Sequence, residues 1–246
     1  MTFPATTPTG KTALVVTAHP GDFVWRAGGA IALHAAQGYR VKICCLSYGE
    51  RGESQFAWKK AGVSLAGVKA QRRDEAERAA AILGAEIEFF DAGDYPLRGT
   101  EAIIDRLVDI NHELQPSFIL THALEDPYHI DHPEATRLAQ EARIIAQAAG
   151  HKPDPSRAYA APPVFLFEPH QPEQCNFKPN VILNISDVWD RKYEAFQVLA
   201  AQKHLWEYYT RVALNRGVQG GRNSGRPMTY GEAYQRLFPM IVEHLA

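Results

Sequence analysis

A histidine and an aspartate, His19 and Asp22, directly follow an apolar, β-branched run near the start of the chain. A run of this kind, followed by His-Pro-Gly-Asp and then by helix-compatible sequence, is typical of a buried parallel strand, a loop and a helix start. In open α/β sheets, ligands bind at the carboxyl ends of the strands. We therefore expect both side chains to reach a common point, where an imidazole and a carboxylate suit a metal ion.

A third candidate ligand, His132, lies in the segment HALEDPYHIDH, which follows a later expected strand. Two loops at strand ends can meet over one point in a doubly wound sheet. Two imidazoles and one carboxylate are a common catalytic ligand set for zinc and also the facial triad of non-haem iron. The alternative, in which these residues are only hydrogen-bonded loop residues, stays open on residue types alone.

The elements that must position these residues alternate between strand and helix along the whole chain. The pattern predicts strands over residues 12–18, 40–46, 86–90, 117–121, 164–167 and 181–185, and helices over 25–37, 68–83, 101–114, 133–149 and 187–204. The charged helix over 68–83 is expected to be solvated. This alternation predicts an α/β fold with a Rossmann-like parallel sheet and helices on both faces.

The composition is that of an ordinary globular chain of 246 residues, with 46% hydrophobic and 22% charged residues. We expect residues 1–11 to be a disordered tail and residues 12–246 to form one domain, whose part from about 186 to 246 is helical with a Gly/Arg-rich loop. A net charge of −2 predicts neither nucleic acid nor a membrane surface as partner. Three cysteines without a disulfide or CxxC pattern favour a reducing cytoplasm.

Two short motifs carry a family resemblance: HPGD followed by a helix with GG, and later HIDH opening another helix. Together they resemble the LmbE-like (PIG-L) family of zinc-dependent enzymes, most of which deacetylate N-acetylated sugars. The resemblance implies a Rossmann-like fold and one divalent metal, zinc, held by His19, Asp22 and His132.

The first motif departs from the family at one position. The family has His-Pro-Asp-Asp, and the Asp after the proline is the general base that activates the metal-bound water; here that position is Gly21. Loss of a general base removes an effect worth roughly 10²–10⁴ in rate. Deacetylation would then need another carboxylate, such as Glu50, Asp94 or Asp126. A metal-binding module without catalysis is a second alternative.

Three longer stretches, HPGDFVWRAGGAIALHAAQGY, CLSYGERGES and FEPHQPEQC, resemble the hydratase branch of this family, which acts in bacterial gallate breakdown. That resemblance implies metal-dependent addition of water to a carbon–carbon double bond in a small tricarboxylate. A metal that acts as Lewis acid on the developing enolate agrees with the absence of the base.

Hydration needs an acid and a base, and several loop residues are candidates. We favour Glu50 and His170, because the resemblance covers both, over Glu53 in the same loop. His129 is expected to donate to an oxyanion, with Asp131 orienting it. In the alternative interpretation these side chains only hold their loops in place.

Arginines are expected to bind the substrate's carboxylates, because a trianion that enters a cleft loses water and needs charged donors. The candidates are Arg51, beside Glu50, and Arg222 and Arg226 in the segment NRGVQGGRNSGRP. We expect this glycine-rich segment to be a mobile loop that closes over the site, or over the site of a neighbouring subunit in a homo-oligomer. The alternative is a flexible, solvated loop.

Overall fold

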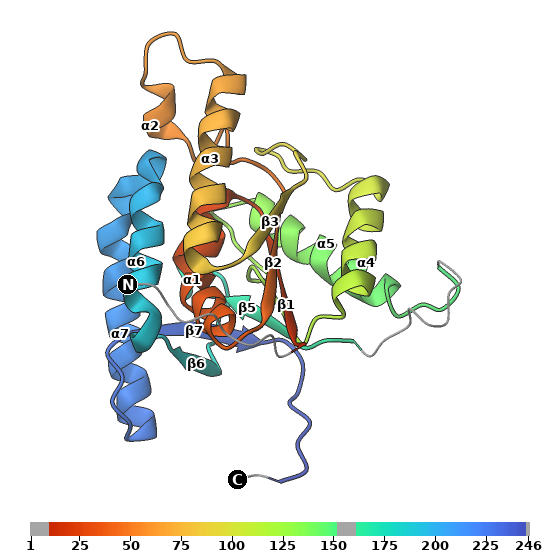
Figure 1. The fold of residues 1–246 in the computed structure, drawn as a ribbon, viewed down its shortest axis with the longest axis vertical. Coiled ribbons are helices and arrows are strands. Elements are labelled where there is room, and N and C mark those ends of the chain that lie inside the picture. Colours follow the sequence, from red (N-terminus) through yellow and green to blue (C-terminus); the bar gives the residue numbers. More distant parts are fainter. Residues whose placement is uncertain (1–9, 152–160, 245–246) are drawn as a thin grey trace.

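The computed structural model describes residues 10–151 and 161–244 and contains a seven-stranded sheet with helices on both faces (Figure 1). The strands are β1 (Thr12–Thr17), β2 (Arg40–Cys45), β3 (Glu86–Phe89), β4 (Ile119–Thr121), β5 (Val164–Phe167), β6 (Val181–Asn184) and β7 (Gly231–Arg236). Their order in the sheet is β3-β2-β1-β4-β5-β7-β6. The predicted α/β class and single domain are confirmed, whereas the predicted tail lies mostly in residues 1–9, outside the described residues.

The sheet is parallel over five neighbouring strands and antiparallel at one edge. β1, the central strand, pairs in parallel with β2 and β4, and β3 and β5 extend the sheet on either side. β7 runs antiparallel to both of its neighbours, β5 and β6. The sequence analysis did not predict β7, because its sequence GEAYQR has no apolar run, although Ala233 and Tyr234 are buried.

The helices form two layers around the sheet. They are α1 (Pro20–Ala36), α2 (Gln55–Trp58), α3 (Leu65–Leu83), α4 (Glu101–Leu114), α5 (Asp131–Ile145), α6 (Trp189–Val198) and α7 (Trp206–Ser224), with 3₁₀ turns η2 (Ser186–Val188) and η3 (Ala200–Leu205). α1, α3 and α6 pack together on one face of the sheet, while α4 and α5 cover the other (Figure 1). Each layer has its own buried apolar core. No helix in the described part of the chain is long and apolar enough to span a membrane.

α1 begins five residues before the predicted start at residue 25. Pro20 occupies the first turn, where its missing N–H costs nothing. The Asp22 carboxylate accepts a hydrogen bond from the backbone N–H of His19 at 3.1 Å, which makes His19 the N-cap residue. The first motif is therefore a helix start rather than a loop, and its short-range hydrogen bonds fix the positions of both candidate ligands.

A buried carboxylate from β7 is inserted against the middle of α1. Glu232 accepts hydrogen bonds from the backbone N–H groups of Gly29 (2.6 Å) and Ala30 (2.7 Å), from Lys192 Nζ (2.6 Å) and from the Tyr234 hydroxyl (2.5 Å). A Cβ on Gly29 would lie only 2.8 Å from a Glu232 oxygen. The second glycine of the AGG sequence is thus required for this approach.

The expectation of a solvated charged face on α3 is correct for Arg73, Asp74, Glu77 and Arg78, which are exposed. It is wrong for Arg72 and Glu75, which are buried and whose side chains bond each other at 2.7 Å. The glycine-rich segment near the C-terminus is not a loop, because α7 continues to Ser224. A Cβ on Gly217 would lie 2.0 Å from the Thr229 carbonyl oxygen, so this glycine allows the following chain to pack closely against the helix.

Candidate active site

Three buried side chains, those of His19, Asp22 and His132, meet at the carboxyl ends of β1 and β4. His19 Nδ1 lies 3.1 Å from Asp22 Oδ2, and His132 Nε2 lies 3.4 Å from Asp22 Oδ1. The N-terminal turn of α1 supplies the first two residues, and the first turn of α5 supplies the third. The structure therefore brings together the three residues that the sequence analysis proposed as ligands.

Both histidines are oriented by carboxylates on their far sides. His132 Nδ1 is 2.7 Å from Asp126 Oδ2, which leaves His132 Nε2 buried and without a hydrogen-bond partner. His19 Nε2 is 3.2 Å from Asp131 Oδ2. This arrangement is typical of metal sites, in which a ligand histidine donates its other ring N–H to a carboxylate. The expectation that Asp131 orients His129 is wrong, because Asp131 orients His19.

The charges around His19 favour a cation at this point. Burial alone would lower the pKa of His19, but the neighbouring carboxylates, Glu53 foremost, outweigh it and raise the pKa well above its usual value. Burial would likewise raise the pKa of Asp22, yet His132 and His122 hold that pKa well below its usual range. The carboxylates around His19 and the unpartnered imidazole nitrogen of His132 together fit a divalent metal ion.

Asp131 has a second function in this loop. Its carboxylate also accepts hydrogen bonds from the backbone N–H groups of Tyr95 and Leu97, at 3.0 and 2.8 Å. Burial acts against ionisation, but the hydrogen bonds from His19 and from these backbone groups lower the pKa of Asp131 to about 2. Asp131 therefore connects the 91–99 loop to His19.

Another histidine, His122, stacks on His132 with ring centroids 4.2 Å apart. Its Nε2 accepts a hydrogen bond from the Ala18 N–H at 3.0 Å, and burial lowers its pKa well below the usual value. His122 is therefore a neutral ring that supports His132.

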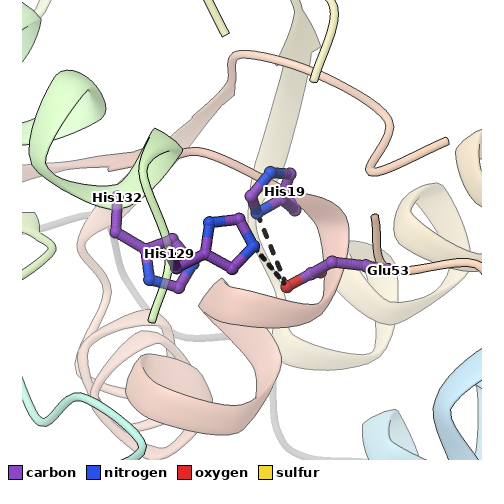
Figure 2. Close-up of side chains that lie close together, drawn as sticks. All are labelled: His19, Glu53, His129 and His132. Atoms are coloured by element: carbon purple, nitrogen blue, oxygen red, sulfur yellow. Dashed lines mark ion pairs between the residues drawn. The ribbon is translucent and has the colours of Figure 1, made fainter. Parts of the chain in front are cut away.

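Glu53 and His129 lie directly over the three ligands. Figure 2 shows Glu53 pointing toward His19 and His129, and its Oε1 is 3.6 Å from His19 Nδ1 and from His129 Nε2. The His129 ring stacks on His132 at 3.9 Å and contacts the Tyr95 hydroxyl through Nε2 at 3.0 Å. Burial, followed by the charge of His132, lowers the pKa of His129 to about 3, so this ring is neutral near pH 7.

The structure does not bring Glu50 to this group. Its side chain is buried on the other side of the loop, where the Tyr48 N–H donates to it at 3.3 Å and Lys69 Nζ lies 3.6 Å away. Burial raises the pKa of this carboxyl. The Ser54 hydroxyl donates to the Gly49 carbonyl at 2.7 Å in the same turn. Glu53, and not Glu50, is the glutamate of this loop that lies beside His19.

A cleft of about 200 Å³ opens above the group. The residues that line it are Asp22, Trp25, Arg26, Glu53, Asp126, Tyr128, His129, His132, His170, Gln171, Gln202, Leu205 and Tyr209. His170 thus lies where the sequence analysis expected it, with its ring stacked on Tyr208 at 4.1 Å. Burial, followed by the charge of Arg26, lowers its pKa.

The three arginines expected to bind carboxylates do not line this cleft. Arg51 has a side chain that is 51% exposed and donates to the Asp94 carbonyl. Arg222 lies in the last turn of α7, and Arg226 lines a separate hollow beside β6. Arg26, which the sequence analysis missed, does line it. Its place one helical turn after Asp22 would have been a signal had the helix been predicted from residue 20.

The position of the family's missing base is filled by other side chains. A Cβ on Gly21 would lie 2.3 Å from Gln202 Oε1 and 2.6 Å from Trp25 Nε1. Arg72 Nη2 donates to Gln202 Oε1 at 2.9 Å, which turns Gln202 Nε2 toward Glu53 Oε2 at 3.4 Å. Gly21 therefore leaves room for a buried hydrogen-bond network that Gln202 of η3 and Arg72 of α3 form.

The parallel sheet with a histidine and carboxylate cluster at its strand ends defines a class of metal-dependent α/β enzymes. The family described as PIG-L, GlcNAc-PI de-N-acetylase, matches residues 14–143, and the chain belongs to this family. The resemblance predicted from the two motifs is thus confirmed. The family is generally metal-dependent, which agrees with the grouped His, Asp and Glu side chains.

Within the family, the chain is similar to hydratases. It is 58% identical over 240 residues to the 4-oxalmesaconate hydratase of Pseudomonas putida, covering 96% of this chain and 93% of that protein. The crystal structure of GalB, the 4-carboxy-2-hydroxymuconate hydratase of P. putida KT2440, superposes with a TM-score of 0.93 at 58% identity, covering 96% of this chain and 100% of that one.

A deacetylase shares the fold at much lower identity. The N,N'-diacetylchitobiose deacetylase of Pyrococcus horikoshii matches with a TM-score of 0.75 and 24% identity, over 92% of this chain and 84% of that one.

Proposed function

We propose that this chain is a hydro-lyase that adds water to the carbon–carbon double bond of 4-oxalomesaconate to give 4-carboxy-4-hydroxy-2-oxoadipate. The similarity to two hydratases over nearly the whole chain supports this function. The observation that carries it within the site is Gly21, where the amide of Gln202 fills the place of the deacetylase base. The deacetylase base of the family is absent at this position, whereas Glu53, His129 and His170, which we propose for hydration, all line the cleft.

We propose zinc as the metal, held by His19, Asp22 and His132. The unpartnered, buried Nε2 of His132 and the carboxylate of Asp22 beside it fit such an ion. When bound, the metal supplies Lewis-acid stabilisation to the developing enolate of the α-keto acid. Asp126 and Asp131 hold the two imidazoles with their ligand nitrogens toward Asp22.

Two proton transfers accompany the reaction, because the hydroxyl bonds to C4 while a neighbouring carbon gains a proton. In our proposal His170, whose lowered pKa favours the neutral ring, takes the proton from the attacking water. Glu53, which lies over the candidate ligands, acts on the substrate's enol or C3 and passes the proton to carbon. Glu53 thus replaces Glu50 in the role that the sequence considerations favoured, and His170 keeps its own. The neutral ring of His129 donates a hydrogen bond to the oxyanion.

The location and assembly of the protein are further proposals. We propose a cytoplasmic location, which is supported by three buried, free cysteines, Cys44, Cys45 and Cys175. A homo-oligomer in which Arg222 or Arg226 reaches a neighbouring subunit's site stays a prediction.

The reaction can be tested by assaying the purified protein in parallel with 4-oxalomesaconate and with an N-acetylglucosamine derivative. We expect hydration with kcat within reach of the ~10 s⁻¹ typical of enzymes and no measurable release of acetate. Deacetylation at that rate in the absence of hydration would overturn the proposed function.

The proton-transfer roles are tested by comparing two glutamates of one loop. Glu53→Gln and His170→Ala should each lower kcat by roughly 10²–10⁴ while metal content stays intact. The matched control is Glu50→Gln, which we expect to keep kcat because Glu50 does not reach the cleft. Loss of activity in the Glu50 variant together with a normal Glu53 variant would reverse the assignment.

A further inference from the structure

Arg26 lines the cleft with a guanidinium group that the described part of the chain leaves incompletely paired. The residue is 8% exposed, and its Nε and Nη1 atoms are buried without a hydrogen-bond partner. A buried guanidinium that lacks acceptors has lost water without replacement, which costs free energy. Buried donors left unpaired in a native structure call for an acceptor from outside the chain.

The carboxylate of Asp22, which forms an ion pair with Arg26, is already engaged. Asp22 Oδ1 lies 3.5 Å from Arg26 Nε, but the same oxygen faces His132 Nε2 at 3.4 Å. Its other oxygen, Oδ2, accepts from the His19 backbone N–H and faces His19 Nδ1, both at 3.1 Å. Asp22 therefore serves the histidine cluster and leaves donors of Arg26 available.

The surroundings of Arg26 show which kind of ligand it suits. Among the described residues that line the cleft, Arg26 is the single arginine or lysine. Its charge also reaches the imidazole of His170, whose pKa it helps to lower. An anion bound at Arg26 would thus lie between the histidine cluster and His170.

We propose that Arg26 binds a carboxylate of the substrate through two of its N–H groups and thereby sets which carbon faces Glu53 and His170. This inference rests on the proposed hydration of a tricarboxylate. A planar guanidinium matches a carboxylate with two parallel hydrogen bonds, which gives orientation as well as affinity. Arg26 takes the role that the sequence analysis gave to Arg51, Arg222 and Arg226.

Steady-state kinetics on 4-oxalomesaconate test this role. In Arg26→Gln we expect KM to rise at least tenfold, or about 1.4 kcal/mol, with a smaller change in kcat. Arg51→Gln, on an exposed arginine outside the cleft, is the matched control and should keep the wild-type KM. An Arg26→Gln enzyme with normal metal content and an unchanged KM would overturn the proposal.

Direct binding of an unreactive tricarboxylate separates this inference from the proposed reaction. By calorimetry, tricarballylate should bind the wild-type protein at least tenfold more tightly than it binds Arg26→Gln, whether or not 4-oxalomesaconate is hydrated. Equal affinity refutes the role of Arg26 even if hydration is observed.

A second variant covers the case in which Arg26→Gln fails to fold or loses metal. Arg26→Lys keeps the charge beside Asp22 but not the planar pair of donors, and we expect it to raise both KM and the tricarballylate dissociation constant several-fold. Wild-type values for both in Arg26→Lys would refute the two-donor contact.

Discussion

Two groups of buried charged side chains lie along α1 and differ in how completely they are hydrogen-bonded. At the middle of the helix, the carboxylate of Glu232 accepts from two backbone N–H groups, from Lys192 and from Tyr234. At the first turn, His132 Nε2 and two nitrogens of Arg26 are buried without a partner. We infer from this difference that Glu232 stabilises the fold, whereas His132 and Arg26, which both line the cleft, are available to a ligand.

The largest effect that this comparison predicts is in His132→Ala. Metal binding should be lost, and kcat should fall by at least roughly 10³, because Lewis-acid stabilisation worth several kcal/mol disappears. The metal-free variant should also lose some stability, because His132→Ala removes the hydrogen bond between His132 Nδ1 and Asp126 and the ring that stacks on His122. Elemental analysis and calorimetry measure the two quantities.

His151→Ala, in a surface ion pair with Asp105, serves as the control and should keep the metal. A His132→Ala protein that retains its metal would contradict the comparison.

Glu232→Gln should give the opposite result. Removing this charge leaves Lys192 buried without its counter-ion, and we expect a loss of about 3–5 kcal/mol in the free energy of unfolding. Metal content and KM of the folded protein should be unchanged. Denaturant unfolding of the single variant and of Glu232→Gln/Lys192→Met measures the effect, and the double variant should recover most of the loss.

The smallest expected effects come from two glycines of α1. Gly29→Ala places a Cβ 2.6 Å from Ile185 and 2.8 Å from Glu232, so it should cost about 1–3 kcal/mol of stability without altering KM. Gly21→Ala places a Cβ 2.3 Å from Gln202 Oε1, so it should displace Gln202 from Glu53 and reduce kcat.

Gly21→Ala should also lose stability, and combining it with Gln202→Ala should recover part of that loss, because the contact with Gln202 is removed while the one at 2.6 Å from Trp25 Nε1 remains. Chemical denaturation and kinetics of the four proteins measure this coupling. Equal effects of the two glycine variants on kcat would show that the two groups do not differ in function.

The meeting of His19, Asp22 and His132 at one point could be predicted because short-range signals mark these positions. His19 and Asp22 follow a long apolar run, and His132 opens a helix. The residues next to each of them in the sequence are therefore enough to predict that they lie at strand ends. The parallel strands were predicted for the same reason. β7 was not, because a short strand of mixed residues takes its stability from two neighbours that are distant in sequence.

The glutamate and the arginine of the cleft depended on tertiary contacts. Glu50 and Glu53 occupy the same polar loop, and the fold of the loop directs Glu53 toward His19 and Glu50 toward Lys69. Arg26 can be recognised as a residue of the cleft only when α1 is known to begin at Pro20. Likewise, the glycines of α7 resemble a flexible loop, although they allow close packing of the chain that follows.

The place of β7 in the sheet also dictates an order of events during synthesis of the protein. In the described sheet, β6 is an edge strand whose neighbour is β7, and β7 separates it from β5. A ribosome makes β6 some fifty residues before it makes β7. The growing chain can therefore pair its parallel strands early. β6 can join the sheet only after residues 231–236 have been synthesised, because β7 is its neighbour.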